Sequence, residues 1–257
     1  MAAATSGCCC EPGKPTVPVT DTEPFTNTEP FTNTVLLTGT VLLRGFEPFN
    51  GAASNSSADP VALVASRWSS PVRLITAVLP ITFDTAPHKP DRLLSEHSPD
   101  LVIATGLATG RAAITPERIT INLADARIPD NFGAQPLDLP LDETGPSAYF
   151  SGLPVKAIVA RLTAEGISSA LSQNAGTFVC IALMYRLMRS VHGTVLHAGF
   201  IHLPCSPEVA FGIGIGTGTG TGEPSLELET IARALELAIE VSSEPHPQAP
   251  IRGGAES

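Results

Sequence analysis

The chain has 257 residues, of which 43% are hydrophobic and only 16% charged, so it is long enough to bury one substantial core. Its formal charge of -10 and its pI near 5.0 argue against a nucleic-acid partner, because phosphates repel an acidic surface. No apolar stretch approaches the roughly 20 residues that cross a bilayer, and the first residues do not look like a signal peptide, so we expect a cytoplasmic protein without a membrane partner.

The first 33 residues are rich in Thr, Pro, Asn and Glu, a composition that cannot bury enough surface to offset its ordering entropy. We therefore predict a disordered tail over residues 1–33. A doubled segment follows, in which residues 35–37 and 41–43 both read Val-Leu-Leu and compete for the same buried strand. Only the second copy leads directly into the aromatic motif at 45–49, so we predict the first strand at 40–44.

Downstream, short apolar runs alternate with helical patterns. The strands are predicted at 72–79, 101–105, 119–123, 168–172 and 195–203. The helices are predicted at 60–67, 85–97, 154–165, 177–191 and 226–241. This alternation favours an α/β fold, a single-domain three-layer α/β/α sandwich around a twisted mixed sheet, similar to phosphorylases and hydrolases. We expect it to span residues 34–243.

Two further segments are predicted to lack regular structure. Residues 212–222 consist of Gly, Ile and Thr and look like a flexible connector before the last helix. Residues 244–257 are expected to form a disordered C-terminal tail.

Cys180 is the first candidate for chemistry, because it falls in the first turns of the helix predicted at 177–191. A thiol at that place lies near the positive end of the helix dipole, which lowers its pKa and supplies thiolate. The alternative is that Cys180 is a small buried hydrophobe on an amphipathic helix. Its position alone does not decide between the two.

His202 and Glu117 are the candidate partners of this thiol. His202 stands at the end of a predicted strand, before a proline that cannot continue the ladder, so its ring could face a cleft at the strand ends. A lone histidine there is also compatible with a purely structural role. Glu117 could hold the imidazole tautomer in a nucleophile–base–acid triad, or it could pair with Arg118 or Arg111 on the surface.

Five motifs, in order along the chain, resemble those of the pyroglutamyl peptidase I family of cysteine peptidases. They read Gly-Phe-Glu-Pro-Phe at 45–49, Ile-Thr-Pro-Glu-Arg at 114–118, Asp-Ala-Arg-Ile-Pro-Asp-Asn at 125–131, Ala-Gly-Thr-Phe-Val-Cys at 175–180 and Gly-Phe-Ile-His-Leu-Pro at 199–204. The resemblance covers roughly residues 40–242. It implies an enzyme that removes N-terminal pyroglutamate from peptides, and that assembles as a homotetramer.

Position by position, the resemblance makes Cys180 the nucleophile, His202 the general base and Glu117 the residue that orients it. Arg127 matches an arginine that stabilises charge near the cysteine. The pocket for the pyroglutamyl ring is implied to consist of Phe46, Phe49, Phe178 and Val179. Apolar walls suit this neutral, nearly flat lactam.

Metal and cofactor requirements are not expected, because the chain has no His-Glu-x-x-His run and no clustered Cys/His ligand spacing. Three positions depart from the family pattern: Asn50 and Leu107 beside the predicted pocket, and Cys205 in place of an aromatic residue. Cys205 either lies near the cleft, where it could trap an oxidised Cys180, or points into the core. Two alternative functions stay open, a transferase similar to nucleoside phosphorylases and an inactive peptide-binding homologue.

Overall fold

The computed structural model describes residues 39–49, 55–83, 88–217 and 223–244, all of which belong to one compact unit, Thr32–Ser257. Several predicted features lie outside these residues. They are the tail at 1–33, the first Val-Leu-Leu copy, Asn50, residues 218–222 of the connector and nearly all of the C-terminal tail.

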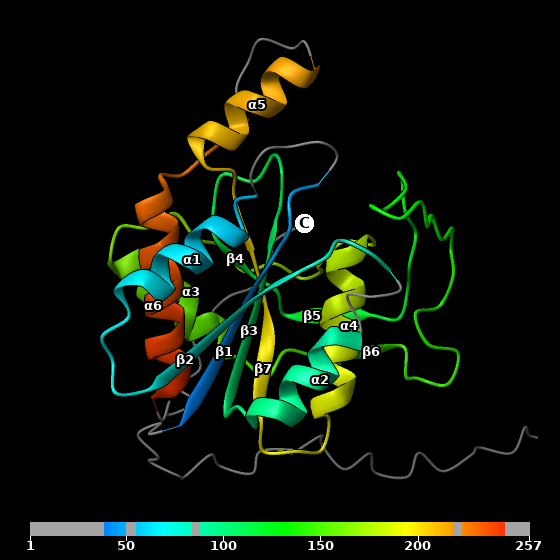
Figure 1. Cartoon of the computed structure of the whole chain (residues 1–257), viewed down its shortest axis with the longest axis horizontal. Coiled ribbons are helices and arrows are strands. Elements are labelled where there is room, and N and C mark those ends of the chain that lie inside the picture. Colours follow the sequence, from blue (N-terminus) through cyan, green and yellow to red (C-terminus); the bar gives the residue numbers. More distant parts are fainter. Residues whose placement is uncertain (1–38, 50–54, 84–87, 218–222, 245–257) are drawn as a thin grey trace, which may run out of the picture. The chain divides into compact units, whose positions relative to one another are not determined.

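A five-stranded sheet in the order β2-β1-β3-β7-β4 forms the middle layer (Figure 1). Its strands are β1 (Thr40–Phe46), β2 (Arg73–Leu79), β3 (Leu101–Leu107), β7 (His197–Leu203) and β4 (Thr115–Pro116). The first four run parallel, whereas β4 pairs antiparallel with β7. The predicted mixed sheet is thereby confirmed. A separate two-stranded sheet pairs β5 (Ile119–Ile121) with β6 (Ala148–Phe150).

Helices cover both faces of this sheet, as the predicted three layers require (Figure 1). One face carries α1 (Ala58–Arg67), α3 (Val155–Ala164) and α6 (Leu228–Ser243), with α1 and α3 both packed against α6. The other face carries α4 (Val179–Val191) with α2 (His88–His97) beside it.

The alternation of side chains along each strand divides the apolar residues between two cores. From β1, Val41 and Leu43 join the core beneath α1, α3 and α6, while Leu42 and Phe46 join the core beneath α4. From β7, Phe200 joins the α4 core and Ile201 the opposite one. His202 therefore continues the row of side chains that faces α4.

The chain leaves the neighbouring strands β1 and β3 in opposite directions, since β1 leads through α1 to β2 at one edge of the sheet and β3 leads to β4 at the other edge. Such a divergence opens a crevice at the carboxyl ends of the two strands. Phe46 and Leu107 are the last residues of these two strands.

The predicted strand at 168–172 is wrong in detail. Ile114 N donates to Ser168 O (2.9 Å) and Arg118 N to Ser172 O (2.9 Å), but only isolated bridges join the two segments. The ladder is interrupted because Pro116, between these two donors, has no N–H.

The connector predicted at 212–222 also needs correction, because α5 occupies Pro207–Thr217. The residues before it form a helix start that the glycine content obscured. Pro207 is the first helical residue, Glu208 lies in the first turn, and Val209 N donates to Ser206 Oγ (3.4 Å). In the described part of the chain, no helix is both long and apolar enough to cross a membrane.

Candidate active site

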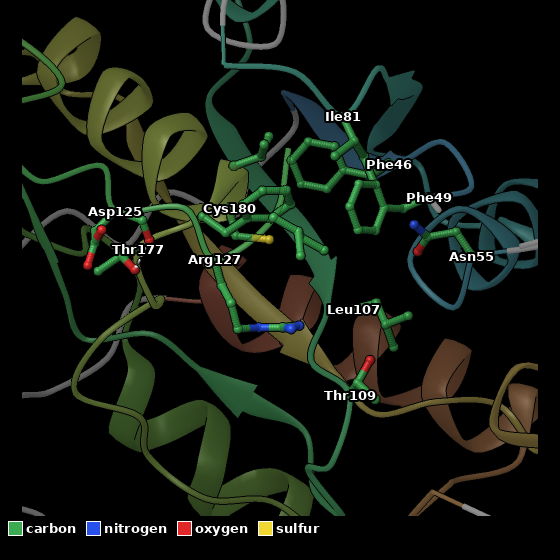
Figure 2. Close-up of a pocket in the computed structure, with 13 residues that line it drawn as sticks. Phe46, Phe49, Asn55, Ile81, Leu107, Thr109, Asp125, Arg127, Thr177 and Cys180 are labelled. Carbon is green, nitrogen blue, oxygen red and sulfur yellow. Dashed lines mark hydrogen bonds between the residues drawn. The ribbon is translucent and has the colours of Figure 1, made fainter. Parts of the chain in front are cut away.

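A cavity of about 310 Å³ opens at the carboxyl ends of the parallel strands (Figure 2). Phe46 reaches it from β1, Leu107 from β3 and Cys180 from the first turn of α4. The remaining lining residues come mainly from the loops around these ends: Phe49, Asn55, Ile81, Thr109, Asp125, Arg127, Ile128, Thr177, Phe178 and Val179.

Cys180 is delivered to the cavity by a tight turn before α4. Gly176 has φ +81°, a left-handed conformation that favours glycine, and its N–H donates to Asn174 Oδ1 (2.7 Å). Thr177 is tied to Asp125 by two hydrogen bonds, from Asp125 N to Thr177 O (3.0 Å) and from Thr177 Oγ1 to Asp125 O (2.7 Å). Cys180 is the second residue of α4 and so lies in the first turn of the helix, where the sequence predicted it, although the helix begins at Val179 and not at residue 177.

The sulfur of Cys180 packs directly against the sheet at Gly106. A Cβ atom placed on Gly106 would lie 2.8 Å from Cys180 Sγ and 2.8 Å from Phe200 Cζ. Gly106 is also the register partner of His202 between β3 and β7, and paired residues of parallel strands face the same side. The missing side chain at Gly106 therefore leaves the space in which the thiol lies, on the face that His202 shares.

His202 and Glu117 are in direct contact although 85 residues separate them. His202 Nδ1 lies 2.7 Å from Glu117 Oε1, and the two residues are 4% and 0% exposed. Phe200 supports the imidazole with its ring, at a centroid distance of 4.9 Å. A buried carboxylate at Nδ1 fixes the proton on that nitrogen and leaves Nε2 able to accept one.

Arg111 makes the second contact to the same carboxylate oxygen. Its NH1 group lies 2.7 Å from Glu117 Oε1 and 2.7 Å from Thr115 Oγ1. Glu117 thus contacts both the imidazole and an arginine, which is Arg111 rather than Arg118, but its carboxylate is buried and not on the surface as the arginine alternative had it. The sequence did not single out Arg111 as part of the site, although its spacing of six residues before Glu117 was visible.

Burial controls the protonation of the thiol and the imidazole. Desolvation, followed by the charge of Glu117, raises the pKa of Cys180 to about 12, although Arg111 acts in the opposite direction. The predicted lowering of this pKa by the helix dipole is therefore outweighed. Desolvation lowers the pKa of His202 below its usual value, against the hydrogen bond to Glu117. These shifts favour a neutral thiol and a neutral imidazole at pH 7.

The aromatic wall of the cavity extends beyond the residues that the sequence indicated. Phe178 lies between Phe49 (ring centroids 5.4 Å apart) and Phe83 (5.5 Å). Phe46 and the aliphatic Val179 also line the cavity next to these rings, and both are almost fully buried. Phe83, Asn55 and Ile81 were missed, because only their folded neighbours associate them with the site.

Phe46 is held from behind by a chain of hydrogen bonds. Its N–H donates to Ser57 Oγ (2.9 Å), and Ser57 Oγ donates to Asn55 Oδ1 (2.8 Å). The other end of the Asn55 amide donates to Glu47 O (2.7 Å). The turn after β1 is thereby fastened to the start of α1.

Arg127 lies on the exposed rim of the cavity, beside Asp125. Figure 2 shows its side chain running from the loop near Cys180, with the guanidinium directed toward the Leu107 and Thr109 side. Asp130 anchors this loop by accepting a hydrogen bond from Phe83 N (2.7 Å). Among the residues described here, no three His, Cys, Asp or Glu side chains are grouped to hold a metal ion.

Cys205 is fully buried in a small cluster with Val209 and Ala210, behind the cavity wall at Leu107. Both Cys180 and Cys205 are free thiols. Of the two alternatives for Cys205, the structure supports the core position.

Comparison with known proteins points to one family. The sequence profile described as Pyroglutamyl peptidase matches residues 39–245. A pyrrolidone-carboxylate peptidase of Pectobacterium carotovorum is 47% identical over 167 residues, covering 64% of this chain and 78% of that protein. Pyrrolidone-carboxylate peptidase 1 of Photorhabdus laumondii is 43% identical over 216 residues, covering 81% of this chain and 95% of the relative.

Solved structures give the same result. The crystal structure of pyroglutamyl peptidase I from Bacillus amyloliquefaciens superposes with a TM-score of 0.73 at 39% identity, over 79% of this chain and 96% of the other. A mutant pyrrolidone carboxyl peptidase from Pyrococcus furiosus gives a TM-score of 0.74 at 37% identity, over 79% and 97%.

Proposed function

The chain belongs to the pyroglutamyl peptidase family and is a cysteine peptidase that removes N-terminal pyroglutamate, and we propose that Cys180, His202 and Glu117 carry the reaction. One observation supports this assignment above all. Cys180 lines the mainly apolar cavity, and its sulfur packs against Gly106. The buried His202–Glu117 pair lies on the same face of the sheet.

In the first half of the reaction, the Cys180 sulfur attacks the carbonyl carbon of the pyroglutamyl residue. Its proton passes to His202 Nε2, which is free to accept because Nδ1–H donates to Glu117. A raised thiol pKa and a lowered imidazole pKa mean that this transfer accompanies the attack and does not precede it. The tetrahedral intermediate then expels the peptide amine, which takes the proton from His202 and leaves a thioester.

In the second half, water replaces the amine. His202 Nε2 accepts a proton from the attacking water, the thioester carbon–sulfur bond breaks, and the proton returns to the sulfur. Pyroglutamate and the free enzyme result. Glu117 stabilises the imidazolium that forms twice in each cycle.

The cavity suits a neutral lactam ring. Phe46, Phe49, Phe178 and Val179 supply apolar walls, and we propose that they contact the two faces of the ring. An unblocked N-terminus would have to bury its ammonium group against these apolar walls, which is costly. Arg127, on the rim, is proposed to stabilise negative charge that develops near the sulfur.

The direct test is release of a fluorescent amine from a pyroglutamyl amide, with the corresponding free-amino glutaminyl amide as a control. We expect hydrolysis of the first substrate only. Cys180→Ala and His202→Ala should abolish turnover, whereas Glu117→Gln should retain a measurable remainder, since an orienting group matters less than nucleophile or base. Full activity of Cys180→Ala would overturn the assignment.

The same assay separates the two alternatives. A transferase similar to nucleoside phosphorylases would consume a nucleoside with phosphate and leave the pyroglutamyl amide intact. An inactive homologue would bind a pyroglutamyl peptide without releasing amine. No observation at the site favours either one over hydrolysis.

We further propose that the peptidase unit spans residues 34–243 and acts in the cytoplasm, and that it assembles as a homotetramer, as the family resemblance implies. Deleting residues 1–33 should leave activity and melting temperature nearly unchanged, because the family match begins at residue 39. Light scattering of the purified protein tests the tetramer, and a mass other than four chains would refute it.

A further inference from the structure

Glu117 presents a single oxygen to two different partners. Oε1 lies 2.7 Å from His202 Nδ1 and 2.7 Å from Arg111 NH1, while Oε2 is buried and accepts no hydrogen bond within the described part of the chain. The carboxylate is fully buried, and among the described residues its cationic partners are Arg111 and, when protonated, His202. Its negative charge therefore depends on Arg111 for compensation.

We propose that Arg111 is a positioning residue of the reaction, which fixes and neutralises Glu117 so that Glu117 can hold the His202 imidazole for proton transfer. This inference rests on the proposed function. Arg111 does not line the cavity, so it acts through Glu117 and not on the substrate.

The position of Arg111 is itself defined by β4. Its NH1 group also donates to Thr115 Oγ1, and Thr115 is the register partner of His202. Arg111, Thr115, Glu117 and His202 therefore form one connected unit at the edge of the sheet. A shift of the guanidinium would move Glu117 relative to the ring that it orients.

Arg111 also sets the charge that the reacting groups experience. Its positive charge lowers the pKa of Cys180 and of His202, in both cases against the opposite effect of Glu117. These are the charged groups that act on the thiol and the imidazole from the surrounding elements. Without Arg111, the uncompensated carboxylate would raise the pKa of His202, and the imidazole would be protonated, and inactive as a base, up to a higher pH.

Four single variants test the role of Arg111. Arg111→Met removes the charge and the hydrogen bonds, and Arg111→Lys keeps the charge. Thr115→Val removes the second anchor. Arg118→Met is the matched control, because Arg118 lies next to Glu117 and, among the described residues, it is Arg111 and not Arg118 that pairs with the carboxylate. For each, kcat and KM are measured between pH 5 and 9 with the pyroglutamyl amide, and folding is checked by the melting temperature.

We expect Arg111→Met to lose roughly 10- to 100-fold in kcat with little change in KM, since a displaced orienting group impairs proton transfer more than binding. When its kcat is plotted against pH, the acid limb, where kcat falls as His202 becomes protonated, should move to higher pH. Arg111→Lys should recover part of the rate, and Thr115→Val should show a smaller loss than Arg111→Met. Arg118→Met should match the parent protein.

A double variant decides whether Arg111 acts through Glu117. In a Glu117→Gln background, Arg111→Met should cost less than about 3-fold, because the group it positions is already gone. Losses that multiply, or an unshifted acid limb in Arg111→Met, would refute the inference. If Arg111→Met does not fold, Arg111→Lys and Thr115→Val take its place, and a kcat equal to that of the parent protein in both would refute the inference. Full activity of Glu117→Gln alone would instead refute the proposed triad.

Discussion

Replacing Gly106 by alanine perturbs the surroundings of the proposed nucleophile while Cys180 itself stays intact. The new Cβ would lie 2.8 Å from Cys180 Sγ and 2.8 Å from Phe200 Cζ. Nonbonded heavy atoms prefer separations of roughly 3.5–4.0 Å, so each neighbour must retreat by about 0.7–1.2 Å, or share that movement with the strand. Phe200 is fully buried and Cys180 is anchored in the first turn of α4, so neither moves freely.

The magnitudes favour a loss of both activity and stability. Overpacking a core costs about 1–3 kcal/mol, more than the roughly 0.5–1 kcal/mol gained when a strand glycine becomes alanine. For a unit of this size, each kcal/mol corresponds to about 2–4 °C in melting temperature. A thiol displaced by about 1 Å from the attack geometry should lower kcat/KM on the order of 100-fold.

The assay combines kcat/KM for the pyroglutamyl amide with thermal unfolding, and Gly212→Ala in α5 serves as the control. A Cβ on Gly212 meets no atom within 4 Å, so this variant should behave like the parent protein. A Gly106→Ala variant with unchanged activity and melting temperature would show that the close packing of sulfur against the sheet is not needed.

Three further predictions follow from the site. Phe178→Ala removes the ring between Phe49 and Phe83 and should raise KM about 10-fold. Phe132 is 77% exposed, so Phe132→Ala should leave KM unchanged. Equal KM values for the two variants would contradict the role of the aromatic wall in binding. Ser57→Ala leaves the buried Phe46 N–H without its acceptor and should cost about 1–3 kcal/mol in the free energy of unfolding, measured by urea denaturation; an unchanged midpoint would refute this. Because the pKa of Cys180 is raised to about 12, thiolate forms only at high pH, so alkylation of Cys180 by iodoacetamide, followed by peptide mapping, should accelerate up to pH 10; a plateau near pH 7 would contradict it.

The layered fold was predictable because apolar runs and helical patterns alternate in the chain, and this information is local. Cys180 at the start of a helix and His202 at the end of a strand are also local features. Glu117 was ambiguous, because its two candidate partners depend on how β4 lies against β7. Contacts of this kind, between residues far apart in sequence, came from the resemblance and not from the pattern.

The remaining differences have physical causes that a linear reading misses. The sign of the Cys180 pKa shift depends on how closely the sheet packs around the sulfur, and the helix position alone suggested the opposite sign. For α5, the Gly and Thr content led to the prediction of a flexible connector, and the signals for a helix start at Ser206 and Pro207 were overlooked. The strand at 168–172 is broken by a proline in its neighbour, not by its own residues.

The backbone that follows this proline is restrained by segments on both of its sides. Beyond Pro116, successive amides point to opposite neighbours, since Glu117 N donates to Phe200 O (2.9 Å) and Arg118 N donates to Ser172 O (2.9 Å). The backbone that carries the carboxylate is thus held between two segments, and it cannot swing toward one without detaching from the other. Hydrogen exchange at these two amides should therefore be slow and should occur together, when this edge of the sheet opens as a unit.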